Sequence, residues 1–118
     1  MTAATEFDLG PLTWVKGEID LALERAAEAL GQHELSGDAT QLRFCRTHVH
    51  QVHGALSIVG LDGVTQVTES LEALLGALEE RRVQPTAENL TTLTQAMAAL
   101  RKYLDDLLAG EPNQPLRL

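Results

Sequence analysis

The apolar residues of this chain recur in alternating steps of three and four, and polar clusters divide them into four segments. Steps of this size place side chains on one face of an α-helix, so each segment predicts an amphipathic helix. The first helix is expected over residues 11–30, with Pro11 in its first turn and Gly31 just beyond its end. Its apolar positions are Leu12, Val15, Ile19, Ala22, Leu23, Ala26 and Leu30.

The three later helices have narrower and more regular apolar seams. A capping residue precedes each predicted helix, and a helix breaker follows it. In chain order these pairs are Asp38 and Gly60, Asp62 and Pro85, and Thr86 and Gly110. The seams are Leu42, Cys45, Val49, Val52, Leu56 and Val59; then Val64, Val67, Leu71, Leu74, Leu75 and Leu78; then Leu90, Leu93, Met97, Leu100, Leu104 and Leu107.

Four amphipathic helices with short connections predict an all-α fold, an antiparallel four-helix bundle over residues 11–110. Leu and Ala dominate the apolar residues, and aromatic residues make up only 3% of the chain, which favours helices over strands. Residues 1–10 are expected to form a flexible lead. Residues 111–118, which include two prolines, are expected to begin a linker to a following domain, so that the chain is a fragment.

The net charge and composition of the chain argue against several kinds of partner and indicate its location. Seventeen acidic residues against nine basic ones give a net charge of −8, which argues against nucleic acids and anionic membranes as partners. No apolar run is long enough to span a bilayer, and the first ten residues lack the pattern of a signal peptide. A single cysteine fits a reducing compartment. A cytoplasmic location is therefore expected.

Three histidines crowd the middle of the second predicted helix, at positions 48, 50 and 53. An α-helix turns by about 100° per residue, which puts His50 roughly 140° from the centre of the apolar seam. His50 should therefore face solvent, whereas His48 and His53 should lie on opposite flanks of the core. The residues expected to share the outer face with His50 are Arg43, Arg46, Thr47, Gly54 and Ser57.

An exposed neutral imidazole can accept a phosphoryl group and later release it to a carboxylate. Arg46 and His53, one turn on either side of His50, are candidate donors to the phosphoryl oxygens. Gly54 leaves open space beside the ring, at a cost of about 1 kcal/mol relative to alanine. Two other interpretations remain open: an exposed helical histidine often has no specific role, and Gly54 can equally mark a close helix–helix contact.

Other chemistry finds little support in the sequence. Residues two apart on a helix point to different sides, so His48 and His50 cannot share a metal ion. His50 and His53 can supply two ligands, but no third is evident, and neither a metal site nor a cofactor is predicted. No phosphate-binding glycine loop or Ser/His/Asp set can be recognised. Cys45 belongs to the apolar seam and is expected to be a core residue.

The segment from His50 to Gly60 resembles the signature of histidine phosphotransfer (HPt) domains. In that signature a histidine is followed by two residues, a lysine, a glycine and, five residues further on, an apolar residue and a second glycine. His50, Gly54, Val59 and Gly60 fit it without a gap. The resemblance implies a bundle of four or five helices, and so allows an extra short helix. It also implies that Glu72, on the next helix, hydrogen-bonds the phospho-accepting histidine, as in CheA-type HPt domains.

Residues 12–19, 43–45, 49–52 and 110–118 are similar to the N-terminal region of the large CheA-like hybrid kinases of the Pil-Chp system, which control type IV pili and twitching motility. The related pilus protein FimL has a similar domain without the histidine. This resemblance implies a CheA-type kinase domain as phosphodonor, CheY-like receivers as acceptors, and other pilus-system proteins as further partners. The chain itself has no recognisable nucleotide site and is not expected to be a kinase.

The resulting hypothesis is a phosphorelay domain with His50 as phospho-acceptor, Glu72 as orienting residue, and Arg46 and His53 as flanking donors. The residues expected to dock a receiver are Arg43, Thr47, Gly54 and Ser57. The usual lysine of the signature is His53 here, and a histidine is positively charged only when protonated. That departure favours the alternative, a degenerate HPt-like interaction module that is not phosphorylated.

Overall fold

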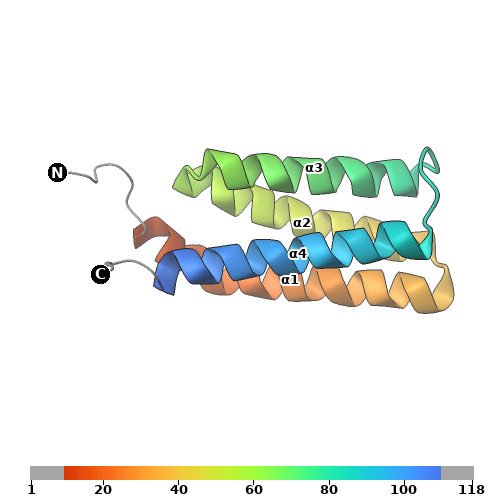
Figure 1. Ribbon diagram of the computed structural model, residues 1–118, viewed down its shortest axis with the longest axis horizontal. Coiled ribbons are helices and arrows are strands. Elements are labelled where there is room, and N and C mark those ends of the chain that lie inside the picture. Colours follow the sequence, from red (N-terminus) through yellow and green to blue (C-terminus); the bar gives the residue numbers. More distant parts are fainter. Residues whose placement is uncertain (1–9, 110–118) are drawn as a thin grey trace.

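The computed structural model describes residues 10–109, which form four helices joined by short loops, without a strand in this range (Figure 1). The helices are α1 (Gly10–Ser36), α2 (Ala39–Val59), α3 (Asp62–Glu79) and α4 (Ala87–Ala109). Successive helices run antiparallel, which confirms the all-α antiparallel four-helix bundle. No fifth helix occurs within residues 10–109. Gly10, predicted to be the last residue of the flexible lead, is instead the first residue of α1. The rest of the predicted lead, residues 1–9, the linker over residues 111–118 and the helix end at Gly110 lie outside the described residues.

The predicted seams meet in one apolar core built mostly from leucine. On α2 and α4 the first five seam positions are buried, and only the last position of each, Val59 and Leu107, is partly exposed. On α1 all predicted apolar positions are buried except Val15, which is partly exposed. Burial of these seams removes apolar surface from water and is the main force that holds the helices together.

α1 continues past its predicted end, so the prediction that Gly31 lies just beyond the helix was wrong. The helix runs to Ser36, and Gly37, at a φ of 72°, ends it with an N–H that donates to the His33 carbonyl (2.7 Å). The longer helix buries the His33 side chain, whose Nδ1 lies 3.0 Å from the Asp38 carbonyl oxygen. This packing outweighs the cost of about 1 kcal/mol for a glycine inside a helix.

Two predictions for α3, its N-cap and one position of its apolar seam, were wrong. Asp62 is the first residue of the helix rather than its cap, because Leu61 occupies the N-cap position without a side-chain hydrogen bond. Val67 is exposed, and Thr68 takes its place in the seam as a fully buried residue. The Thr68 hydroxyl donates to the Thr65 carbonyl (2.6 Å), so its polar atom is satisfied inside the core.

The boundaries predicted around α2 and at the start of α4 are confirmed. The Asp38 carboxylate accepts from the Thr40 N–H (2.9 Å), and the Thr86 hydroxyl accepts from the Asn89 N–H (3.1 Å). Gly60 ends α2 in the left-handed conformation, at a φ of 80°. These caps satisfy backbone groups that a helix end otherwise leaves without partners.

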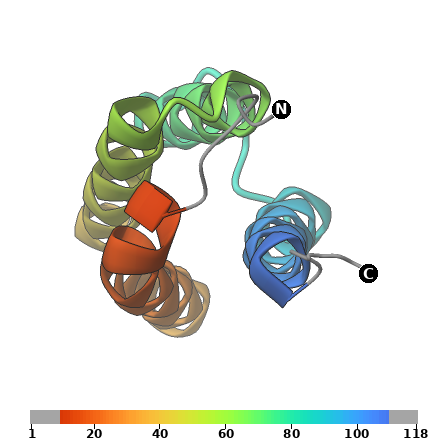
Figure 2. The same cartoon turned by 90° about the vertical axis from the view of Figure 1, so that its left-hand side faces the viewer.

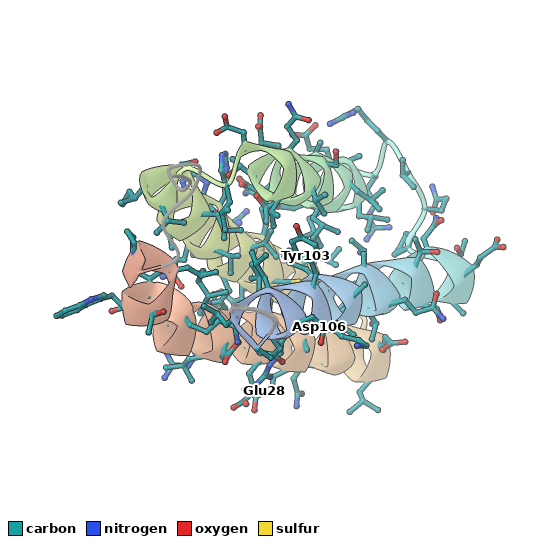
Figure 3. All side chains as sticks on the ribbon, turned by 60° about the vertical axis from the view of Figure 1, so that its left-hand side comes forward. Glu28, Tyr103 and Asp106 are labelled. Atoms are coloured by element: carbon teal, nitrogen blue, oxygen red, sulfur yellow. The ribbon has the colours of Figure 1, made fainter. Side chains whose placement is uncertain are left out.

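The helices are arranged unevenly around the core. α2 packs closely on both α1 and α3, whereas α3 and α4 have the fewest contacts among the helix pairs that touch (Figure 2). An apolar groove between α3 and α4 is lined by Val67 and by Tyr103, which is labelled on α4 in Figure 3. In the described part of the chain, none of the helices has both the length and the apolar character required to cross a bilayer. Side-chain hydrogen bonds from Arg43, Arg46, His50 and His53 of α2 to glutamates of α3 also join these two helices.

Candidate functional site

Glu72 of α3 binds two histidines of α2 at once. The Nδ1–H of His50 donates to Glu72 Oε2 (2.9 Å), and the Nδ1–H of His53 donates to Glu72 Oε1 (2.7 Å). The two rings lie edge to face, with centroids 5.8 Å apart and planes at 86°. Each carboxylate oxygen thus fixes one imidazole, and the three side chains form one cluster.

Helix geometry explains why these residues meet. His50 and His53 are three positions apart, so they lie on one side of α2 about one turn from each other. Leu71, directly before Glu72, is buried in the α3 seam, which leaves Glu72 on the flank that faces α2. The backbones of two packed helices therefore place the cluster, rather than a loop.

Exposure separates the two histidines. The His50 side chain is 70% exposed, whereas that of His53 is 25% exposed and that of Glu72 21%. A carboxylate only accepts hydrogen bonds, so the ring nitrogen facing it carries the proton. With its proton on Nδ1, neutral His50 has its lone pair on Nε2. The site thus presents an oriented, exposed nucleophile with a carboxylate behind it.

A second carboxylate on α3 holds the two arginines of the same face. Arg46 Nε–H donates to Glu79 Oε1 (2.9 Å), and Arg43 Nε–H donates to Glu79 Oε2 (3.0 Å). The hydrogen bond from Arg46, followed by that from Arg43, lowers the pKa of the Glu79 carboxyl below its ordinary value. Arg46, His53, Glu72 and Glu79 line a common surface groove between α2 and α3.

The expected docking residues all lie at the surface of α2. Thr47, Gly54 and Ser57 are exposed, as is Arg43 with its guanidinium on Glu79. A Cβ atom added at Gly54 would have no neighbouring atom within 4 Å. Gly54 therefore marks no close helix–helix contact inside this domain, and the space beside it is open to a partner.

Two further residues behave as the sequence indicates. Cys45 is fully buried in the core, and this burial raises the pKa of its thiol to about 12, so it is not a reactive thiolate. His48 is on another side of α2, where its Nδ1 lies 3.2 Å from Gln51 Oε1. Within the described residues, His48 makes no hydrogen bond or ion pair with the Glu72 cluster, so it is a natural reference histidine on the same helix.

Sequence reasoning placed His50 at the surface and Glu72 beside it, but missed two features. The hydrogen bond between Glu72 and His53 was not predicted. It places Glu72 beside both histidines, so that Glu72 is the third potential metal ligand that could not be identified from the sequence. Sequence reasoning also missed Glu79 as the partner of both arginines. The seven-residue separation of Glu72 and Glu79, equal to that of the histidine and arginine pairs, was the available signal.

Comparison with known proteins gives one match. The family model described as the Hpt domain matches residues 12–108, which covers all but the ends of the described bundle. Neither the search of curated proteins nor that of solved structures found a match.

Proposed function

Because the chain belongs to the Hpt domain family, whose members carry out histidine phosphotransfer in two-component signalling, we propose that His50 is its phospho-acceptor. One observation carries the assignment: His50 is the exposed histidine whose Nδ1–H is held by a carboxylate. His48 lacks a carboxylate partner in the structure, and His53 is mostly covered. Of the three, His50 combines access with orientation.

The proposed reaction uses the two ring nitrogens separately. The Nε2 lone pair attacks the γ-phosphorus of ATP held by a kinase, and the N–P bond forms as the P–O bond to ADP breaks. The ring keeps its Nδ1 proton and becomes positively charged, which the Glu72 carboxylate stabilises at 2.9 Å. Transfer to a receiver reverses these changes: an aspartate oxygen attacks the phosphorus, and the electron pair of the N–P bond returns to Nε2.

Two flanking residues complete the proposed site. His53 takes the position of the family's usual lysine and, held by Glu72, lies one turn beyond His50. Arg46 lines the same groove, and its bond to Glu79 uses only Nε–H of the five N–H donors of a guanidinium. The remaining N–H groups of Arg46 can donate to the phosphoryl oxygens, whereas His53, whose Nδ1–H is held by Glu72, can donate to them only when its Nε2 is also protonated. Gly54 and Ser57, with Thr47 and Arg43, form the proposed receiver-docking surface.

Hpt domains exchange phosphoryl groups with kinases and response regulators. For this chain we place a CheA-type kinase domain upstream and CheY-like receivers downstream, in a chemosensory system that controls type IV pili and twitching motility. The resemblance of residues 12–19 and 43–45 to Pil-Chp hybrid kinases supports this assignment. ATP and receivers of this kind are cytoplasmic, so the domain is placed in the cytoplasm.

The test is phosphorylation by a CheA-type kinase domain with γ-labelled ATP. We expect an acid-labile, alkali-stable label on the wild-type chain and on His48→Gln, no label on His50→Gln, and loss of the label when a CheY-like receiver is added. No label on the wild type, or equal label on His50→Gln, would overturn the assignment.

The second candidate is an interaction module that uses the same bundle without phosphorylation. The observation in its favour is His53, which replaces the family's lysine and whose Nδ1–H is already bound to Glu72. This module would bind a pilus-system partner through α2, and His50→Gln would leave that binding unchanged. Phosphotransfer instead predicts that the label depends on His50, which separates the two functions.

A further inference from the structure

The cluster of His50, His53 and Glu72 has a second chemical capacity that phosphotransfer does not use. Each residue offers one ligand atom, and these atoms lie within 4.8 Å of one another. Two come from one turn of α2 and the third from α3. We propose that these three side chains form a site for a divalent zinc ion on the α2–α3 face.

The donor types select the metal. Two imidazole nitrogens and one carboxylate oxygen are a common zinc ligand set, completed by a water molecule in the fourth position. Magnesium and calcium prefer oxygen ligands alone, so this mixed set disfavours them. The exposure of His50 leaves room for the fourth ligand on the solvent side.

The three side chains must shift to accept the ion. The two N···O separations are 2.9 and 2.7 Å, and both Nδ1 atoms face the same carboxylate. Ligands at about 2.0–2.1 Å around a tetrahedral ion are about 3.3 Å apart. The two N···O contacts must therefore lengthen by roughly half an ångström, while the widest ligand separation, up to 4.8 Å, must shorten. His50 has solvent around most of its ring and can make this movement.

Charge around the cluster favours a cation. The chain carries a net charge of −8, and Glu69 lines the same groove as His53 and Glu72. The two arginines that line this groove, Arg46 and Arg82, each form an ion pair with a glutamate, Glu79 and Glu80 respectively. Their positive charges are thereby offset within the groove, and the excess of acidic residues over the chain attracts the ion.

The site has a consequence that, unlike the site itself, rests on the proposed function. A neutral imidazole that binds zinc through Nδ1 carries its proton on Nε2. His50 then has no lone pair for phosphorus, and Glu72 is occupied by the metal. Zinc binding and phosphorylation of His50 are therefore mutually exclusive.

The primary test is calorimetric titration of zinc into the full 118-residue chain, without a histidine tag and in a non-chelating buffer. We expect one zinc ion per chain, with affinity at least tenfold lower in His53→Gln and in Glu72→Gln. His48→Gln is the matched control, since it removes another α2 histidine outside the cluster, and its affinity should stay within twofold. Circular dichroism of each variant establishes that the bundle is folded.

Absence of zinc binding to the wild type, equal affinity in His53→Gln, or an equal loss in His48→Gln would overturn the zinc site. A second assay uses phosphoramidate, a small phosphodonor that needs no kinase, with and without one equivalent of zinc. Zinc should slow labelling of His50 at least tenfold, and an unchanged rate would contradict mutual exclusion. Failure of the titration with successful zinc-free labelling removes only the zinc site, whereas the reverse result removes only the proposed function.

Discussion

The α2–α3 face contains the same arrangement twice, once with arginines and once with histidines. Arg43 and Arg46 bind the two oxygens of Glu79, and His50 and His53 bind the two oxygens of Glu72. On each helix the two sets are seven residues apart. Seven residues are about two helical turns, so antiparallel packing brings both sets into the same register.

The difference between these sets lies in what the basic side chain can do. A guanidinium is always charged and has no lone pair, so the Arg43–Arg46–Glu79 set can hold the helices together and donate hydrogen bonds but cannot act as a nucleophile. An imidazole has one protonated and one unprotonated nitrogen when neutral, so the His50–His53–Glu72 set can hold a ring and still react. One geometry thus supports a structural clamp at one level of the bundle and a chemical site at the next.

The largest expected effect comes from removing the negative charge of each set in turn. Glu72→Gln should slow phosphorylation of His50 by about 10- to 100-fold, because the developing charge on the ring loses its carboxylate; this is at or below the lower limit of typical acid–base contributions, about 100-fold. Glu79→Gln, the matched change in the other set, should leave the rate within about twofold. Initial rates of labelling by the kinase domain measure both. Equal losses in the two variants would show that the sets do not differ in function.

A smaller effect is expected when His53 is given the family's usual side chain. His53→Lys adds a fixed positive charge near the incoming phosphoryl group. Two opposite charges about 4 Å apart attract by about 1 kcal/mol in water, which corresponds to roughly fivefold in rate. The rate of labelling with saturating kinase should rise accordingly, with Arg43→Lys as a control that alters the other set. A decrease in rate would indicate that His53 acts as a neutral imidazole.

The arginine set should matter for stability. Glu79→Gln should lower the free energy of unfolding at pH 7 by about 0.5–1 kcal/mol, as partly exposed ion pairs do. Because the arginines lower the pKa of Glu79, its contribution is fully present above the ordinary glutamate value of 4.5 and is lost as the pH falls through the lower folded value. Urea unfolding from pH 7 to pH 3 should therefore show the wild type and the variant converging. A difference that grows on acidification would contradict the clamp.

The smallest effect separates docking from packing at Gly54. Gly54→Ala and Gly17→Ala each add a methyl group in open space on a helix, so each should stabilise the fold by up to about 1 kcal/mol. Only the larger Gly54→Leu should slow transfer from phosphorylated His50 to a receiver, whereas Gly17→Leu should not. Equal transfer rates in the two leucine variants would place the docking surface elsewhere.

Much of the bundle could be predicted because heptad-like steps and capping residues act locally. The α2 seam and the Asp38 cap depend on near neighbours in sequence, and both are confirmed. The end of α1 was predicted wrongly because both Gly31 and Gly37 are plausible helix-ending residues in the sequence. Burial of the His33 side chain, which depends on tertiary packing, favours the later end. Thr68 has the spacing of a seam position, but it was not included in the predicted seam because its side chain carries a polar hydroxyl group.

The candidate site was only partly predictable. The helical wheel of α2 places His50 outward without reference to other helices, so its exposure could be predicted. The contact with Glu72 was implied by a family resemblance, since the register of α3 against α2 depends on packing along both helices. For the same reason the seven-residue spacing of the glutamates and of their basic partners could suggest, but not establish, the sharing of Glu72 with His53 and the pairing of Glu79.

The central claim is that Glu72 fixes Nδ1 of His50 and leaves Nε2 to accept the phosphoryl group. Long-range ¹H–¹⁵N spectroscopy of the ¹⁵N-labelled, phosphorylated chain measures this directly, because it identifies which ring nitrogen of which histidine carries phosphorus. The account predicts phosphorus on Nε2 of His50, with His48 and His53 unmodified. Phosphorus on Nδ1 of His50, or on His53, would contradict it.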